Sequence, residues 1–178
     1  MDKAIFEGYI NVTGTSSKKL FKEELGAFRE IIRKGAFADS LQNYRKPYMT
    51  LNHDCKRIIS YGADLELTED KVGLKYIAQI SDLQVISMAM CGSLLGCSFT
   101  FKPMKESLMK DNGWFIRSIN EMILLEVSII EDCALLPCYD SSTIHIKGIP
   151  SELQNSVNAY MKKYKHYEDR IRALRVPR

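Results

Sequence analysis

Segments of alternating apolar and polar residues recur along the first 130 residues of the chain, and turn-forming residues separate them. Because successive side chains of a strand point to opposite faces of a sheet, this period of two predicts β-strands. Residues 68–71 form a turn between two such segments, so residues 63–67 and 73–80 are expected to form a hairpin. The strands predicted in this way are residues 4–12, 48–53, 63–67, 73–80, 96–101, 114–119 and 121–130.

Helical patterns are fewer than strand patterns. Residues 20–43 are expected to be mixed and mostly helical, and Asp82 is placed to cap a helix over residues 83–90, just before Gly92. Strands this far apart in the sequence have to pair non-locally, which a compact barrel or a sandwich achieves. The sequence therefore predicts an α+β fold in which a few helices flank a β-rich domain.

Length and composition indicate one globular domain. The chain has 178 residues, of which 46% are hydrophobic and 26% charged. Its most apolar segment, residues 122–130, is interrupted by Glu126 and is far shorter than the ~18 residues that a membrane-spanning helix needs. Glu7 precedes any apolar stretch at the N-terminus, so we expect no signal peptide and no membrane association.

Cysteine and histidine spacing argues against a metal site. A zinc site needs ligand pairs at short spacing, and His53, His145 and His166 do not supply them. We therefore expect neither a metal nor a cofactor. The five cysteines lack a Cys-x-x-Cys pair, which indicates reduced thiols in a cytoplasmic protein. They are Cys55, Cys91, Cys97, Cys133 and Cys138.

The C-terminal segment differs from the body in charge and in apolar spacing. Residues 159–178 carry a net charge of +5, whereas the remaining residues sum to −2, so the body lacks the basic footprint of a nucleic-acid-binding protein. Steps of four and three between apolar residues predict an amphipathic helix. Three roles are open for this helix: packing on its own domain, self-association into a homo-oligomer, or docking on a partner. The three tyrosines of its apolar seam favour docking over a free coiled coil. The seam is Leu153, Val157, Tyr160, Tyr164, Tyr167, Ile171 and Leu174.

Two polar residues at predicted strands are candidates for catalysis. His53 lies at the end of a strand, where the alternative is an ordinary hydrogen-bonded structural histidine. Ser98 shares a predicted strand face with Gly96 and Thr100, and the alternative for it is an exposed serine without a role. Cys97 is disfavoured as a nucleophile because strand alternation turns it to the face opposite Ser98.

Glu126 is the third candidate, because alternation places it on one strand face with Leu124 and Ser128. A carboxylate among apolar neighbours requires a cation or hydrogen-bond donors, and either an ion pair with Arg117 or contact with His53 would provide them. A serine hydroxyl needs an imidazole to accept its proton and a third group to fix the imidazole tautomer. His53, Ser98 and Glu126 are the residue types for those roles.

Six segments resemble, in order, the motifs of tailed-phage prohead (capsid-maturation) proteases, and the resemblance covers about residues 5–147. Two positions depart from the family pattern. Cys97 stands beside the serine where the family usually has a small or aliphatic residue, and Lys34 stands where a proline commonly precedes Gly-Ala-Phe. The segments are residues 32–41 (IRKGAFADSL), 51–54 (LNHD), 67–74 (LTEDKVGL), 96–99 (GCSF), 125–129 (LEVSI) and 136–143 (LPCYDSST).

This resemblance implies a serine endopeptidase with a fold similar to that of the herpesvirus assemblins, a β-barrel flanked by helices. His53 matches the family's catalytic His-Asp motif and Ser98 its Gly-x-Ser motif. Glu126, in the Leu-Glu-Val-Ser motif, is implied as the third member. The assemblins use a second histidine in that role, so His145 remains a rival orienting group.

The implied activity is cleavage of scaffold and major capsid protein segments during prohead maturation, with those two proteins as partners. The implied location is the bacterial host cytoplasm, within the immature capsid. Residues 1–148 are expected to form the catalytic domain and residues 149–178 the C-terminal helix. A non-catalytic scaffold or capsid-assembly protein with the same fold is the alternative function.

Overall fold

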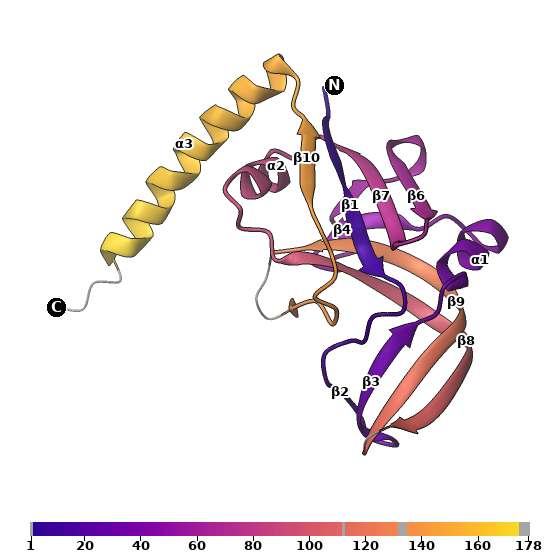
Figure 1. Cartoon of the computed structure of the whole chain (residues 1–178). Helices are drawn as coiled ribbons and strands as arrows, with labels where there is room; N and C mark the ends of the chain where they lie inside the picture. The colour runs from indigo at the N-terminus through magenta and orange to yellow at the C-terminus, as the bar shows by residue number, and fades with distance from the viewer. Residues whose placement is uncertain (1, 112, 132–134, 175–178) are drawn as a thin grey trace.

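Two β-sheets form the body of the protein (Figure 1). The computed structural model describes residues 2–111, 113–131 and 135–174, with the side chains of the last helix described as far as Lys163. The elements are β1 (Ala4–Val12), β2 (Leu20–Lys22), β3 (Gly26–Ile32), α1 (Ala36–Asn43), β4 (Tyr48–Leu51), β5 (Ile58–Ser60), the 3-10 helix η1 (Gly62–Asp64), β6 (Leu65–Glu69), β7 (Gly73–Ile80), α2 (Leu83–Met90), β8 (Gly96–Asp111), β9 (Trp114–Ile130), β10 (His145–Gly148) and α3 (Ser151–Leu174).

The first sheet has the strand order β10-β1-β7-β6, and all its neighbours are antiparallel. β6 and β7 form the hairpin that the sequence predicts, with Asp70 in the turn, where its carboxylate accepts from the backbone N–H groups of Val72 and Gly73. Side chains alternate along β7, so Leu74, Tyr76, Ala78 and Ile80 are fully buried.

The second sheet is built around β9, the longest strand. β8 pairs with β9 antiparallel over its whole length, while β3 and β4 pair parallel with the two ends of β9 on its other edge. β2 extends the sheet beyond β3, and β5 extends it beyond β4. The parallel pairing places Tyr48 level with Glu126 and Thr50 level with Ser128. This register positions the candidate site.

Helices cover the sheets and complete one hydrophobic core. α1 packs against β9 and β6, and α2 packs against α3 and β10. Phe37 of α1 meets Phe99 of β8 edge to face, with ring centroids 5.3 Å apart, and Phe99 stacks on Tyr139. The largest fully buried side chains are Tyr76, Phe6, Phe37, Ile10, Ile32, Met49, Leu51, Leu74, Ile80, Ile86, Ile119 and Met122.

The α+β class and the C-terminal helix are confirmed, with about 49% of the residues in strands and 21% in helices. Within the described residues the two sheets are not closed into a barrel. The predicted helix over residues 83–90 is also confirmed, and the Asp82 carboxylate caps it by accepting from the backbone N–H groups of Gln84 and Val85. No helix of the described chain is long and apolar enough to span a membrane.

The prediction of a mostly helical segment at residues 20–43 is wrong for its first half. Residues 20–32 form β2 and β3, and only α1 is helical. Gly26, the first residue of β3, and Gly35, the N-cap of α1, have φ values of +68° and +92°, a backbone conformation in which another side chain would be strained. β3 owes its strand conformation to parallel pairing with β9, a partner that lies far along the sequence.

The strands predicted at residues 96–101, 114–119 and 121–130 are parts of one long hairpin, in which the last two form a single strand, β9. Residues 102–111 continue β8 although they are polar and include Pro103, because β8 is an edge strand where a missing N–H is tolerated. The short strand β10 is an additional element that the sequence pattern missed. It pairs with β1 from far along the chain.

The C-terminal helix begins against the body and then extends beyond it (Figure 1). Leu153 and Val157 are buried in the core cluster, and Met161 packs against that cluster. The seam positions Tyr164, Tyr167, Ile171 and Leu174 lie outside the side chains that the structure describes, as do His166 and Cys133. The first turns of α3 therefore belong structurally to the body.

We expect Leu153→Ala to lower the free energy of unfolding by about 2–5 kcal/mol, because it removes a buried side chain between α3 and α2. Asn155→Ala, an exposed change on the same helix, is the control. Urea denaturation measures both. A loss of under ~0.5 kcal/mol in Leu153→Ala, equal to that of the control, would contradict the packing.

Candidate active site

His53 follows β4 in a tight turn that brings its backbone back over the sheet. Asn52 and His53 both have left-handed backbone conformations, with φ values of 56° and 58°. Asparagine tolerates this region, but it is uncommon for histidine, and such strain persists only where the surroundings impose it. Here the Asn52 N–H donates to the Ile129 carbonyl (2.9 Å), and the His53 N–H donates to Ser128 Oγ (2.9 Å).

Glu126 lies on β9 directly after a β-bulge. Thr100 pairs with Glu126 and Phe101 pairs with Leu124, so Leu125 is the extra residue of β9. The bulge moves Leu124 to the buried face, which corrects the expectation that Leu124 shares a face with Glu126. Glu126 itself is 7% exposed and points to the opposite face, toward His53.

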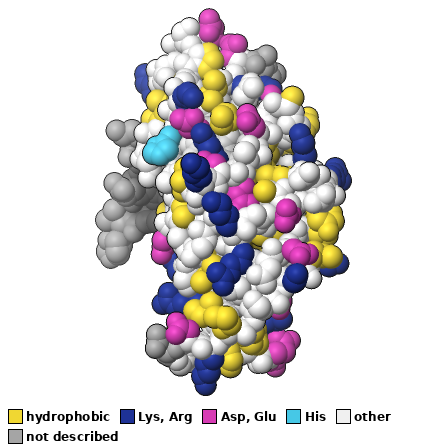
Figure 2. Space-filling model, turned by 45° about the vertical axis from the view of Figure 1, so that its right-hand side comes forward, with side chains coloured by type: hydrophobic (Ala, Val, Ile, Leu, Met, Phe, Trp, Pro, Cys, Tyr) yellow, Lys and Arg dark blue, Asp and Glu magenta, His cyan; other side chains and the backbone are white. Residues whose placement is uncertain are grey.

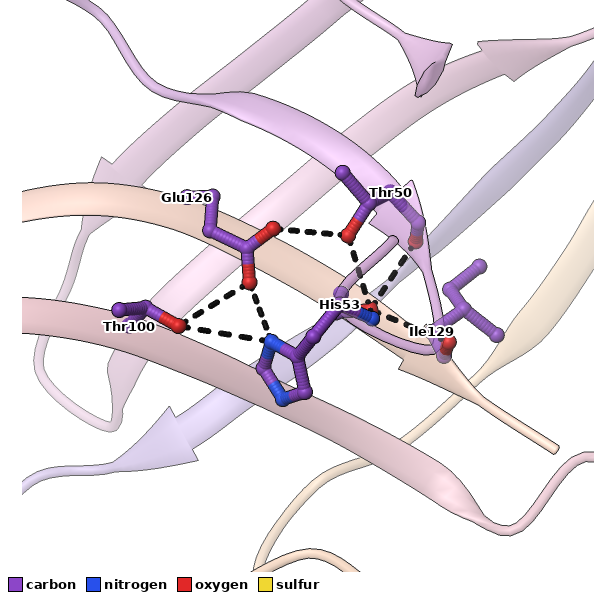
Figure 3. A network of polar contacts seen from close by, with 6 residues as sticks. Thr50, His53, Thr100, Glu126 and Ile129 are labelled. Atoms are coloured by element: carbon purple, nitrogen blue, oxygen red, sulfur yellow. Dashed lines mark hydrogen bonds and ion pairs between the residues drawn. The ribbon is translucent and has the colours of Figure 1, made fainter. Parts of the chain in front are cut away.

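Glu126 and His53 are in direct contact through Oε1 and Nδ1 (Figure 3). Thr50 Oγ1 donates to the other carboxylate oxygen, Oε2 (2.9 Å), and Thr100 Oγ1 donates to Oε1 (3.1 Å). Figure 3 shows the second ring nitrogen of His53 turned away from this carboxylate. The arrangement fixes the ring through Nδ1 and leaves Nε2 available.

The charge state of Glu126 follows from its surroundings. Burial by itself raises the pKa of the Glu126 carboxyl, but hydrogen bonds from His53, Thr50 and Thr100, together with the charge of His53, outweigh burial and hold the pKa below its ordinary value. An ionised carboxylate only accepts hydrogen bonds. Nδ1 of His53 is then the donor in this contact, so a neutral ring has an unprotonated Nε2.

Ser98 lies on the same sheet face as this pair. It pairs with Ser128 on β9, and it is two residues from Thr100, whose hydroxyl lies 3.4 Å from His53 Nδ1. Because paired residues and every second residue share a face, Ser98 stands on the face of Glu126 and Ser128. It is half-buried, and in the described part of the chain its hydroxyl makes no hydrogen bond. The structure thus brings the three predicted residues to one face.

The sequence left two alternatives open, an ion pair between Arg117 and Glu126 and His145 as the group that orients His53. Arg117 forms ion pairs with Glu30 (2.8 Å) and with Glu106, so the suggested ion pair between Arg117 and Glu126 is wrong. His145 lies on β10 in the other sheet, level with Glu7 of β1, and among the described residues it forms no hydrogen bond or ion pair with His53 or Ser98.

Cys97 is a core residue rather than part of the site. It is 1% exposed, and burial raises the pKa of its thiol to about 12, which keeps it protonated. Among the described residues, no group of His, Cys, Asp and Glu side chains could hold a metal ion. The thiols of Cys55, Cys91, Cys97 and Cys138 are free.

Three hydroxyl residues of the site were not predicted. Strand alternation already places Thr100 beside Ser98 and Ser128 beside Glu126, so the sequence contained a signal for both. Thr50 gave no such signal, because its place beside Glu126 and Ser128 depends on the parallel pairing of β4 with β9. Ser128 Oγ also donates to the Thr50 carbonyl (3.2 Å), which links the turn to β9.

A family model described as caudovirus prohead serine protease matches residues 1–166 of the chain. The chain belongs to this family. The resemblance to prohead proteases seen in the sequence is therefore confirmed, and the family name identifies a serine peptidase of capsid maturation. No curated protein and no solved structure gives a significant match to this prohead protease.

We expect Ser128→Ala to lower the free energy of unfolding of this prohead protease by about 1–3 kcal/mol, because the His53 N–H loses its acceptor. Displacement of the ring would also slow peptide cleavage, by roughly 10²-fold. Ser128→Thr keeps the hydroxyl and should restore most of the rate. Urea denaturation and turnover of a peptide measure the two effects.

Ser107→Ala, at an exposed serine on β8, is the control for this experiment and should change neither quantity. Native stability and native turnover in Ser128→Ala would show that the hydroxyl does not hold the turn.

Proposed function

We propose that this prohead protease is a serine endopeptidase that cleaves segments of scaffold and major capsid protein within the immature capsid. The observation that supports it best is the contact between His53 Nδ1 and the ionised Glu126, with Ser98 on the same sheet face. Membership in the prohead serine protease family supports the substrate class.

In the proposed mechanism Ser98 is the nucleophile and His53 the general base. Nε2 takes the hydroxyl proton as Ser98 Oγ attacks the carbonyl carbon of the scissile bond, and the resulting imidazolium then gives that proton to the leaving amine. Water hydrolyses the acyl-enzyme in the same way. Glu126 accepts from Nδ1–H throughout, which fixes the tautomer and stabilises the imidazolium.

The hydroxyls of Thr50 and Thr100 serve this mechanism by holding Glu126. Each donates to a different carboxylate oxygen, so the carboxylate cannot rotate away from Nδ1 without losing a hydrogen bond. Both bonds also favour the ionised form of Glu126, the form that the mechanism requires.

Capsid proteins are the partners that the family implies, and the immature capsid is the place of action. Enclosure with its substrates would give the protease a high effective concentration, so modest intrinsic activity would suffice. The part of α3 that extends from the body is the candidate for self-association or for recruitment to capsid proteins. A truncation after Lys163 keeps Leu153 and Val157 in place and isolates that role.

We expect Ser98→Ala and His53→Ala each to reduce turnover by on the order of 10⁴–10⁶, because each removes one member of a unit. The double variant should be no worse than either single one. Turnover of major capsid protein, followed by mass spectrometry of the products, measures the loss and locates the cut sites.

A double variant much slower than both single variants would mean that the two residues do not act together. An active-site serine probe provides the control: it should label the wild type and Ser107→Ala but not Ser98→Ala. Absence of both cleavage and labelling in the wild type would favour the non-catalytic assembly protein.

We expect Glu126→Gln to lower turnover by about 10²–10⁴, because the amide keeps the shape of the carboxylate but favours the wrong imidazole tautomer. The melting temperature is measured alongside to separate a chemical from a structural effect. His145→Ala is the control and should leave turnover nearly native. Near-native turnover in Glu126→Gln would remove Glu126 from the mechanism.

A further inference from the structure

Large apolar side chains are exposed at the end of the second sheet that lies farthest from α3. Phe21 is 78%, Met109 55% and Trp114 39% exposed. Figure 2 shows hydrophobic side chains gathered at the lower end of the molecule with basic and acidic side chains beside them, at the height where Figure 1 shows the ends of β2, β3, β8 and β9. A cluster of exposed apolar side chains marks an interaction site more often than isolated exposed apolar side chains do.

These side chains lie on one face of the sheet. Phe21 pairs with Ala27, while Arg29 and Met109 both pair with Ile116, so alternation places Phe21, Arg29 and Met109 together. Trp114 is two residues from Ile116 and belongs to the same face. We call Lys19, Phe21, Arg29, Met109 and Trp114 the distal patch. The opposite face carries the buried Phe28 and Glu30, which the fold itself uses.

The distal patch also carries two cations, Lys19 and Arg29, and one carboxylate, Asp111, lies on the same face level with Trp114. Lys19 Nζ lies 5.3 Å and the Arg29 guanidinium 6.0 Å from the centroid of the Trp114 ring. Neither cation has a carboxylate partner among the described residues, whereas their neighbour Lys18 is paired with Asp140 at 2.7 Å. The ring contacts orient both cations without neutralising them.

A hollow of about 460 Å³ adjoins these cations. Its lining holds Lys18, Lys19, Arg29 and the carboxylate of Asp140, together with four hydroxyl residues, of which Thr15 and Ser17 already donate to backbone carbonyls. The hydroxyl residues are Thr15, Ser16, Ser17 and Ser141. Because Lys18 is paired with Asp140, Lys19 and Arg29 are the cations of this hollow that favour an acidic group as its occupant.

The distal patch shares its sheet face with the catalytic cluster at the other end of β9. Bulges at Asn120 and at Leu125 each reverse the alternation, so together they return Glu126 and Ser128 to the face of Trp114. The twelve residues from Trp114 to Glu126 span at most ~40 Å at ~3.3 Å per residue. An extended substrate segment of about twelve residues could therefore reach from one site to the other.

We propose that the distal patch binds an acidic, partly apolar segment of the capsid-protein substrate, remote from the bond that is cut. This inference rests on the proposed function. The positive charges of Lys19 and Arg29 favour an acidic segment, and the exposed Phe21 and Met109 favour apolar side chains next to the acidic ones. Nucleic acid is disfavoured, because the two cations without an ion pair among the described residues match few phosphates.

The test compares a long and a short substrate. The probes are purified major capsid protein and a peptide of eight residues around its cut site, which is shorter than the twelve residues of β9 that separate the two sites. In the double variant Lys19→Glu/Arg29→Glu and in Trp114→Ala, KM for the capsid protein should rise tenfold or more with kcat unchanged. Turnover of the short peptide should stay native in both.

A charge-matched control is the double variant Lys34→Glu/Lys46→Glu, two exposed lysines outside the distal patch, which should leave both substrates unaffected. Unchanged KM for the capsid protein in the patch variants would overturn the inference. So would an equal loss with the short peptide, because that result indicates a structural effect on the catalytic cluster.

Binding measured with Ser98→Ala separates this inference from the proposed function. Major capsid protein should bind Ser98→Ala and bind tenfold more weakly when the patch substitutions are added, even if the wild type proves not to cleave it. Two results would assign the patch to another partner and overturn the proposal. One is tighter binding of a 20-base-pair DNA duplex that the patch variants abolish, and the other is a dimer that Trp114→Ala dissociates.

Discussion

The contact between His53 and Glu126 depends on the parallel pairing of β4 with β9. In that register Tyr48 is level with Glu126, and the chain leaves β4 at Leu51, level with Ile129. The turn at residues 52–53 then brings the His53 ring back to Glu126. The left-handed turn is costly for a histidine, and hydrogen bonds to Ser128 and to the Ile129 carbonyl hold it. A shift of β4 by one residue would turn Thr50 to the other face and remove the site.

Burial raises the pKa of the Glu126 carboxyl and hydrogen bonding lowers it, and the balance between them determines the charge of the site. A carboxylate that is 7% exposed would favour the protonated form if it had no partners. Donors from three elements, the turn after β4, β4 itself and β8, keep it ionised. The same donors fix its orientation, so one set of contacts determines both the charge and the geometry that the proposed mechanism requires.

β9 connects the two ends of the second sheet, and its bulges determine what each end presents. The bulge at Leu125 places Leu124 on the core face and Glu126 on the opposite face, and the bulge at Asn120 brings Trp114 to the same face as Glu126. Toward the core, the same strand buries Ile119, Met122, Val127 and Ile129. One strand thus stabilises the fold through one face and carries the candidate functional groups on the other.

The sequence alone determined the features that depend on neighbouring residues. Period-two alternation predicted the 63–80 hairpin and the separate faces of Ser98 and Cys97, and Asp82 predicted its helix, because strand faces and helix caps are local. Motif resemblance also singled out His53, Ser98 and Glu126. Only the tertiary structure decided the strand character of residues 20–32, the bulges in β9, the partner of Arg117 and the place of Thr50. Each of these depends on pairing between residues far apart in the chain, whose register no local pattern encodes.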